Sequence, residues 1–91
     1  MSTITMYSTR SCPFCVQAEN LLQRKGLAVN KILVDQNQDD FVTMVERTAR
    51  RSVPQIFVGN RHVGGFTDLV ALEQSGQLDE WLKVVEQHES V

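Results

Sequence analysis

The sequence predicts a single α/β domain over residues 1–91, in which a mixed four-stranded sheet carries helices on both faces. Strand-like and helix-like segments follow one another in the order β-α-β-α-β-β-α-α. The helix between the first two strands is long enough for a right-handed crossover, so these strands should be parallel. The Gly59-Asn60 turn should make the last two strands antiparallel. Helices on both faces would then close one core.

The first strand and the first helix flank both cysteines of the chain. We expect a buried strand at residues 3–8 and a helix over residues 14–25. Pro13 suits the first helical position, because its missing N–H would have no partner there. Gly26 can end the helix in the left-handed conformation.

A second strand and a second helix come next. The run at residues 29–34 predicts the strand, and Asn37 is expected to cap the helix, with Asp39 and Asp40 favourably placed in its first turn. Apolar residues that should face the sheet recur at helical spacing; they are Phe41, Met44, Val45 and Ala49.

A hairpin and two helices complete the chain. Strands at residues 55–58 and 61–63 should pair through their two-residue turn, and Gly64-Gly65 should end the second strand. Thr67 is expected to cap a third helix over residues 68–75. An amphipathic stripe predicts the last helix, and its members are Leu78, Trp81, Leu82 and Val85.

The composition excludes several classes of function. A formal net charge of −2 gives neither a basic field for nucleic acid nor an acidic tail. The N-terminus shows no secretory signal pattern, and no apolar run approaches the roughly 20 residues that a membrane span needs. We therefore expect a cytoplasmic protein with no nucleic-acid or membrane partner. The expected oligomeric state is a monomer. In that reducing compartment a catalytic disulfide is more plausible than a structural one.

The two cysteines, Cys12 and Cys15, have C-x-x-C spacing at a strand-to-helix junction. The thiolate is the form that attacks disulfides. Unpaired N–H groups at the helix N-terminus and the positive charge of Arg10 should favour the thiolate of Cys12. Cys15 lies one turn into the helix and should be less exposed. We expect Cys12 to attack a substrate disulfide as the nucleophile, and Cys15 or an external thiol to displace the product.

Two other interpretations of the cysteines are weaker. Two ordinary buried cysteines would not need this spacing, the intervening proline or the junction. A zinc site would need two further ligands, and the chain offers only His62 and His88, which lack ligand spacing. No metal site is therefore predicted.

Three separated motifs give the chain a family resemblance. With Cys12-Pro13-Phe14-Cys15, Ser52-Val53-Pro54 and Gly64-Gly65-Phe66-Thr67-Asp68 in this order, residues 3–85 resemble the dithiol glutaredoxins. The resemblance implies a thioredoxin fold and no tightly bound cofactor. It also implies glutathione as the reducing co-substrate, and glutathionylated or disulfide-containing proteins as substrates.

The resemblance also implies where glutathione binds. Val53 precedes the proline that the family holds in cis, and its backbone would pair with the cysteine of glutathione. Thr67 and Asp68 match the positions that hold the glutamyl end, through a helix N-terminus and a carboxylate. Gly65 would allow a close backbone approach. The full set of expected glutathione contacts is Arg10, Pro13, Phe14, Val53, Pro54, Gly65, Thr67 and Asp68.

The chain departs from the family pattern at three places. Ser52 replaces a frequent threonine before Val53-Pro54 and keeps the hydroxyl. Phe14 replaces a frequent tyrosine. Thr9 replaces a frequent lysine, and the positive charge stands at Arg10 instead. Whether Arg10, Arg50 or Arg51 binds the glycine carboxylate of glutathione is therefore left open.

Several other residues near the motifs receive a structural interpretation. We interpret Gln55 and His62 as surface polar groups. Phe66 and Trp81 are interpreted as core residues, although Phe66 could instead line the site.

Two competing functions are compatible with the same motifs. One is a redoxin that a flavoprotein thioredoxin reductase reduces, against which the Thr67-Asp68 pair argues. The other, of a different class, is a dimer that holds an iron–sulfur cluster through Cys12 of each chain and glutathione. Cys15 and Pro13 count against cluster binding, because a resolving thiol and a rigid turn disfavour it.

Overall fold

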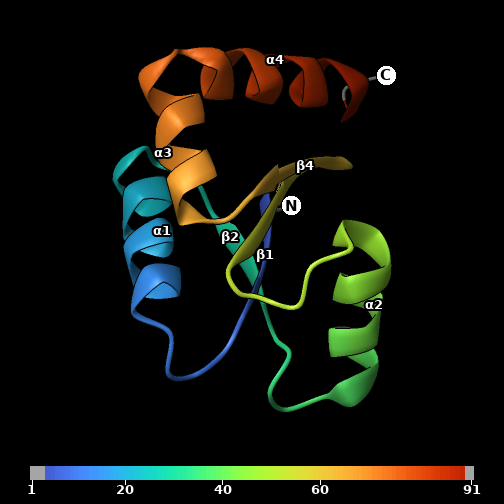
Figure 1. The fold of residues 1–91 in the computed structure, drawn as a ribbon. Helices are drawn as coiled ribbons and strands as arrows, with labels where there is room; N and C mark the ends of the chain where they lie inside the picture. The colour runs from blue at the N-terminus through green and yellow to red at the C-terminus, as the bar shows by residue number, and fades with distance from the viewer. Residues whose placement is uncertain (1–3, 90–91) are drawn as a thin grey trace.

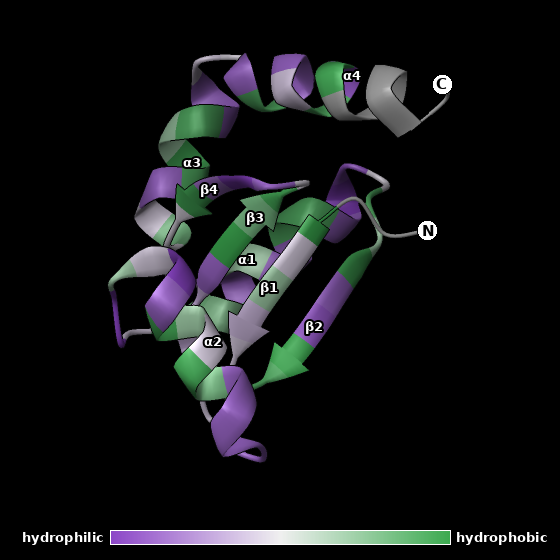
Figure 2. Ribbon diagram, turned by 90° about the vertical axis from the view of Figure 1, so that its right-hand side faces the viewer, coloured by the Kyte–Doolittle hydropathy of each residue, from purple (hydrophilic) through white to green (hydrophobic). Residues whose placement is uncertain are grey.

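The computed structural model describes residues 4–89, and the side chains of residues 4–84. Its sheet has the strand order β2-β1-β3-β4 (Figure 2). Strand β1 (Ile4–Ser8) pairs in parallel with β2 (Val29–Leu33) and antiparallel with β3 (Gln55–Val58). Strand β4 (Arg61–Gly64) pairs antiparallel with β3. The predicted order of elements and the mixed sheet are confirmed.

The helices cover both faces of the sheet, with α2 on one side and α1 and α3 on the other (Figure 1). Helix α1 spans Pro13–Arg24 and helix α2 spans Gln38–Thr48. Helix α3 spans Phe66–Gln74 and helix α4 spans Gln77–Glu89. Among the described residues, no helix combines the length and the apolar character that crossing a membrane requires.

Alternation along the strands divides the core into two clusters, because successive side chains point to opposite faces of a sheet. Ile4 and Met6 point toward α1, α3 and α4, whereas Tyr7 points toward α2. The larger cluster is built from Ile4, Met6, Cys15, Ala18, Leu22, Ile56, Val58, Leu69, Leu72, Leu78 and Leu82. Strand β3 lies between two other strands (Figure 2). All four of its residues are buried.

The second cluster contains Tyr7, Val34, Met44 and Phe57, and Phe41 and Val45 pack against it. Three of the four residues predicted for the inner stripe of α2 therefore face the sheet. Ala49 does not, and that prediction is wrong: it is the exposed C-cap of α2, with a left-handed backbone at φ 59°. The helix ends one residue before the apolar spacing would have ended it.

The ends of the helices confirm some caps and correct one. Asn37 caps α2 through hydrogen bonds that its side-chain oxygen accepts from the backbone N–H groups of Asp39 and Asp40. Gly26 follows α1 with φ 78°, as predicted. The predicted Thr67 cap is wrong, because α3 begins at Phe66 and its N-cap is Gly65. Glycine can serve as an N-cap without a side-chain hydrogen bond, whereas the Gly64-Gly65 pair in the sequence indicates only the end of a strand.

A charged cluster ties the end of α1 to α3 and α4. Lys25 Nζ lies 2.9 Å from Glu73 Oε2 and 3.2 Å from Asp79 Oδ1. The hydrogen bond to Glu73, followed by that to Asp79, raises the pKa of Lys25. In α4, Leu78 and Leu82 are buried and Trp81 packs against the larger cluster, as predicted. Val85, the fourth member of that stripe, and His88 lie outside the described side chains.

Candidate active site

The two cysteines occupy the first turn of α1 and form a disulfide, with their Cα atoms 5.2 Å apart. Cys12 is the N-cap residue, and its Sγ accepts a hydrogen bond of 3.1 Å from the backbone N–H of Cys15. Cys12 is half-buried, whereas Cys15 is 3% exposed. A sulfur at a helix N-terminus is placed where a thiolate is stabilised. The pair can therefore exchange between dithiol and disulfide, with Cys12 as the accessible sulfur.

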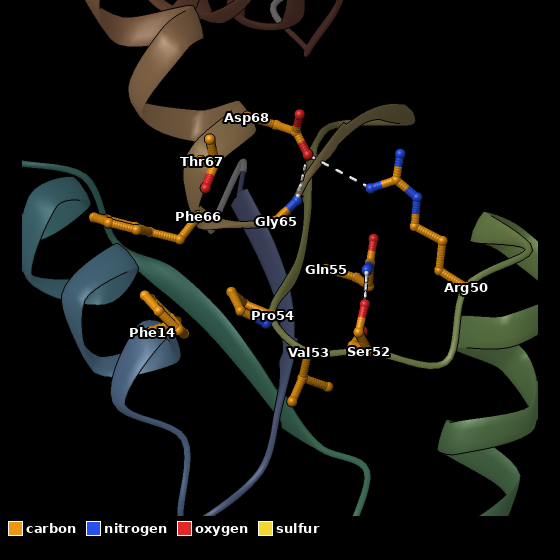
Figure 3. Close-up of a pocket in the computed structure, with 10 residues that line it drawn as sticks. All are labelled: Phe14, Arg50, Ser52, Val53, Pro54, Gln55, Gly65, Phe66, Thr67 and Asp68. Atoms are coloured by element: carbon orange, nitrogen blue, oxygen red, sulfur yellow. Dashed lines mark hydrogen bonds and ion pairs between the residues drawn. The ribbon is translucent and has the colours of Figure 1, made fainter.

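Beside the cysteines, three segments of the chain line one groove (Figure 3). Phe14 comes from the C-x-x-C segment. The peptide bond between Val53 and Pro54 is cis, as the family resemblance implies. Figure 3 shows the rings of Phe14 and Phe66 on one side of the groove and Arg50 on the other. The lining residues are Phe14, Arg50, Ser52, Val53, Pro54, Gln55, Gly65, Phe66, Thr67 and Asp68.

The N-terminus of α3 forms the charged end of this groove. Asp68 Oδ2 accepts a hydrogen bond of 3.0 Å from the backbone N–H of Gly65. The guanidinium of Arg50 lies 3.5 Å from the same carboxylate oxygen. The first amide groups of a helix have no carbonyl one turn earlier, so they are available to an anion. This end of the groove thus presents backbone amide donors, the carboxylate of Asp68 and the exposed guanidinium of Arg50 to a ligand.

Gly64 makes room for that carboxylate. Its backbone has φ 118°, a conformation that favours glycine, and a Cβ atom here would collide with the side chain of Asp68. The glycine pair therefore does more than end β4. It allows Asp68 to fold back over the start of its own helix.

Arg10 and Pro13 are the two expected glutathione contacts that do not line the groove. The Nε atom of Arg10 lies 3.2 Å from Asp35 Oδ2, and the Arg10 backbone N–H lies 3.3 Å from the same oxygen. Desolvation of Asp35 opposes its ionisation, but these hydrogen bonds outweigh it and lower the pKa of Asp35. The charge of Arg10 is therefore shared with a carboxylate after β2.

Four groove residues were missing from the expected contacts: Arg50, Ser52, Gln55 and Phe66. Phe66 was interpreted mainly as core, and it does both, since it packs against the larger cluster and lies 6.1 Å from the Phe14 ring centre. Its place directly after Gly64-Gly65 was the sequence feature that could have indicated a role in the groove. Arg50 lines the groove, whereas Arg10 does not.

Gln55 and His62 are not the surface groups that we expected. Gln55 is 1% exposed, and its side chain donates to the carbonyl oxygen of Ser52 and bonds to His62 Nε2. His62 is half-buried, with its ring centre 5.0 Å from that of Phe57. Desolvation, followed by the charge of Arg50, lowers the pKa of His62. Gln55 shares its face of β3 with the buried Phe57, so alternation could have indicated its burial, but nothing in the sequence named its partners.

Comparisons with known proteins agree with this arrangement. A family model described as Glutaredoxin matches residues 4–63. A glutaredoxin of Neisseria meningitidis is 48% identical over 80 residues, which cover 87% of this chain and 94% of the relative. Glutaredoxin 3 of Escherichia coli is 39% identical over 83 residues, or 91% of this chain and 100% of the relative.

A solved structure shares the fold. The crystal structure of a buckwheat glutaredoxin–glutathione complex matches with a TM-score of 0.83 and 24% identity, covering 92% of this chain and 79% of that one. The fold is thus the thioredoxin fold that the resemblance implied. With a family model over most of the sheet and relatives matched nearly end to end, the chain belongs to the glutaredoxin family, and its chemistry is thiol–disulfide exchange through Cys12 and Cys15.

Proposed function

We propose that this protein reduces glutathione-mixed disulfides and protein disulfides, with glutathione as its reductant. One observation carries the proposal: the C-x-x-C helix, the cis Val53–Pro54 bond and the N-terminus of α3 meet in one groove. The groove combines an apolar side with amide donors and charges at one end. Those are the features that would recognise a small peptide with ionised ends. The buckwheat protein that shares this fold was solved in complex with glutathione.

The proposed reaction on a mixed disulfide needs only Cys12. The Cys12 thiolate attacks the glutathione sulfur, and the protein thiolate leaves and takes up a proton. Glutathione is then held on Cys12 through a disulfide. A second glutathione thiolate attacks that bond, which regenerates Cys12 and releases glutathione disulfide.

Reduction of a protein disulfide uses both cysteines. Cys12 attacks one sulfur of the substrate, and the other substrate sulfur leaves as a thiol. Cys15 then attacks the Cys12 sulfur of this mixed disulfide, which releases the reduced substrate and leaves the Cys12–Cys15 disulfide. Two glutathione molecules return that disulfide to the dithiol. The burial of Cys15 supports its role as the resolving thiol, since it is shielded from substrates in solution but lies close enough to bond with the Cys12 sulfur.

We assign the parts of glutathione to the groove as follows. The backbone of Val53 pairs with the central cysteine, and Phe14 and Pro54 flank it. The backbone at Gly65 and Thr67 and the carboxylate of Asp68 hold the glutamyl end. Pro13, exposed beside Cys12, faces the reacting sulfur.

The groove favours Arg50 as the cation that binds a carboxylate of the ligand. Arg50 lines the groove, and its side chain is 51% exposed. Arg10 could contribute only if its ion pair with Asp35 opened. Arg51 is exposed and does not line the groove.

The proposal includes action as a monomer in the cytoplasm. Both cysteines and every groove residue come from one chain, which is sufficient for the reaction. Glutathione can act as the reductant only where its pool is kept reduced, as in the cytosol. Glutathionylated and disulfide-containing proteins are the partners that this chemistry serves, and no resident cofactor is needed.

The test is NADPH-coupled turnover of a glutathionylated peptide with glutathione and glutathione reductase. We expect turnover that stops when glutathione is omitted. No turnover in this system, with turnover after thioredoxin reductase replaces both components, would show a thioredoxin-reductase-dependent redoxin instead. A brown dimer after iron and sulfide reconstitution, without turnover in either system, would favour the cluster-binding function.

A further inference from the structure

A chain of hydrogen bonds leads from β4 to the floor of the groove through the buried side chain of Gln55. The Nε2 atom of Gln55 lies 3.0 Å from the carbonyl oxygen of Ser52 and 3.3 Å from its Oγ. The Oε1 atom of Gln55 lies 2.7 Å from Nε2 of His62. A buried amide is costly to leave unpaired, so these contacts fix the orientation of the Gln55 side chain.

The direction of each hydrogen bond follows from the donors available. The amide nitrogen of Gln55 can only donate, so it donates to the two Ser52 oxygens. The amide oxygen can only accept, so His62 must carry its proton on Nε2. The result is a relay with one direction, from His62 through Gln55 to Ser52.

His62 is itself held in place at the start of this relay. Its ring lies against Phe57, with ring centres 5.0 Å apart, and Phe57 is 2% exposed in the second core cluster. Its own strand, β4, pairs with β3, which carries both Phe57 and Gln55. The relay therefore begins on the rigid sheet and ends on a loop.

The relay ends at the carbonyl group of Ser52, in the peptide unit directly before the cis Val53–Pro54 bond. Ser52 C=O and Val53 N–H belong to one planar peptide unit and point in opposite directions. Fixing the carbonyl toward Gln55 thus fixes the Val53 N–H toward the other side. In the proposed function, this N–H pairs with the cysteine backbone of glutathione.

We propose that Gln55 and His62 are positioning residues, which orient the Ser52–Val53 peptide so that Val53 can bind the cysteine portion of the glutathionyl substrate. Neither side chain contacts the reacting sulfurs. This inference rests on the proposed function of the groove, and it extends that function from the residues that line it to a residue behind it. Substrate binding should respond to the relay, whereas the intrinsic reactivity of Cys12 should not.

Three variants test the relay. His62→Phe keeps a ring against Phe57 but removes the donor, and Gln55→Met keeps the length of the side chain but removes both of its hydrogen-bonding groups. His62→Gln is the rescue variant, because its amide nitrogen can occupy the place of Nε2 and donate to Gln55. Each is measured for KM and kcat with a glutathionylated peptide, and for the rate at which iodoacetamide alkylates Cys12 in the reduced protein.

We expect KM to rise about three- to tenfold in His62→Phe and Gln55→Met. This range corresponds to the loss of one net hydrogen bond, the one between Val53 and the substrate. The alkylation rate of these variants should stay within about twofold of the wild-type rate. The KM of His62→Gln should also lie within about twofold of the wild-type value. Alkylation does not use the groove, so a merely unfolded or loosened protein would change both measurements. Should Gln55→Met fail to fold, His62→Phe and His62→Gln decide the question.

Two different failures can be told apart. A wild-type protein that does not turn over the peptide would remove the proposed function and this inference together. If the wild-type protein is active and His62→Phe has the same KM, the inference is overturned but the proposed function is not. So would a His62→Gln variant as impaired as His62→Phe, because the donated hydrogen bond would then not be what matters.

Discussion

The backbone N–H of Cys15 points at the Sγ of Cys12 across 3.1 Å, so the nucleophile is held by the main chain of the residue that resolves it. The sulfur replaces the oxygen that usually caps a helix at this position. A charged acceptor gains more from such a bond than a neutral one, so the contact favours the Cys12 thiolate. Cys15 thus contributes through its backbone even when its thiol is removed.

Removing each thiol should therefore have different effects. Cys12→Ser is expected to abolish turnover of every substrate, because the nucleophile is gone. Cys15→Ser keeps the N–H that faces Cys12, so it should retain turnover of a glutathionylated peptide and lose the reduction of protein disulfides. Coupled NADPH oxidation with each type of substrate measures both.

The matched control for these variants is the double substitution of Cys12 and Cys15 by serine, which should match Cys12→Ser alone. Turnover that survives in Cys12→Ser would reverse the two roles. Equal loss of both activities in Cys15→Ser would show that the second thiol is needed even for mixed disulfides.

Asp68 is expected to contribute to substrate binding and not to the chemistry. Asp68→Ala removes the carboxylate at the start of α3, and we expect KM for a glutathionylated peptide to rise about three- to tenfold with kcat little changed. Asp79→Ala is the control, since Asp79 is an exposed carboxylate on α4 that pairs with Lys25. An unchanged KM in Asp68→Ala would take this residue out of the site.

The position of Arg50 predicts which arginine binds a ligand carboxylate. Arg50→Gln should raise KM about two- to fivefold, the range of a partly exposed charge pair. Arg10→Gln, whose arginine pairs with Asp35 outside the groove, should leave KM within about twofold. Steady-state kinetics at low ionic strength make the comparison. A larger effect from Arg10→Gln would mean that the Asp35 pair opens when substrate binds.

The elements of this fold were predictable because local rules decide them. Pro13 and Asn37 mark helix starts by backbone chemistry, and alternation at Ile4 and Met6 marks the buried face of a strand. The cysteine pair could be found for the same reason: its spacing and its junction are local.

What the sequence did not predict depends on contacts between distant segments. Gln55 and His62 look like surface polar residues until the hairpin brings them together, with Gln55 in the lining of the groove. Arg10 was predicted to act at the site because it lies near Cys12 in the sequence. Its guanidinium instead pairs with Asp35, which is 25 positions away. No local pattern contains either partner.

Ala49 shows how a periodic pattern can overrun a helix, and it gives a stability prediction. Its left-handed backbone costs an L-residue about 1–2 kcal/mol, which glycine does not incur. The greater flexibility of glycine in the unfolded chain offsets part of this gain. Ala49→Gly should therefore stabilise the protein by about 1 kcal/mol and raise its melting temperature by about 4–8 °C. Thermal unfolding followed by circular dichroism measures this.

The control for Ala49→Gly is the same substitution at another exposed alanine. Ala71 lies inside α3, where glycine is unfavourable, so Ala71→Gly should destabilise by about 1 kcal/mol. Opposite signs at the two sites are expected. A lower melting temperature in both would show that Ala49 is not in the left-handed conformation in solution.

His62 makes the stability of the fold depend on pH. Desolvation lowers its pKa from the ordinary value of 6.5; Arg50 and Arg47 lower it further, and Asp68 opposes them. Between the lowered folded pKa and 6.5, the unfolded chain binds a proton that the folded chain does not. Stability must therefore fall as pH decreases through this window, and the loss is complete below the folded pKa.

The prediction is tested by comparing wild type with His62→Gln, which keeps a hydrogen-bond donor but cannot titrate. Urea unfolding at about pH 7.5 and about pH 5.5 compares stability on either side of the ordinary histidine pKa, above the range in which ordinary carboxylates protonate. We expect wild type to lose more unfolding free energy than His62→Gln on acidification. Both proteins keep His88, so the difference between them reports His62 alone. Equal losses, or a wild type that gains stability at the lower pH, would contradict a histidine that the fold holds neutral.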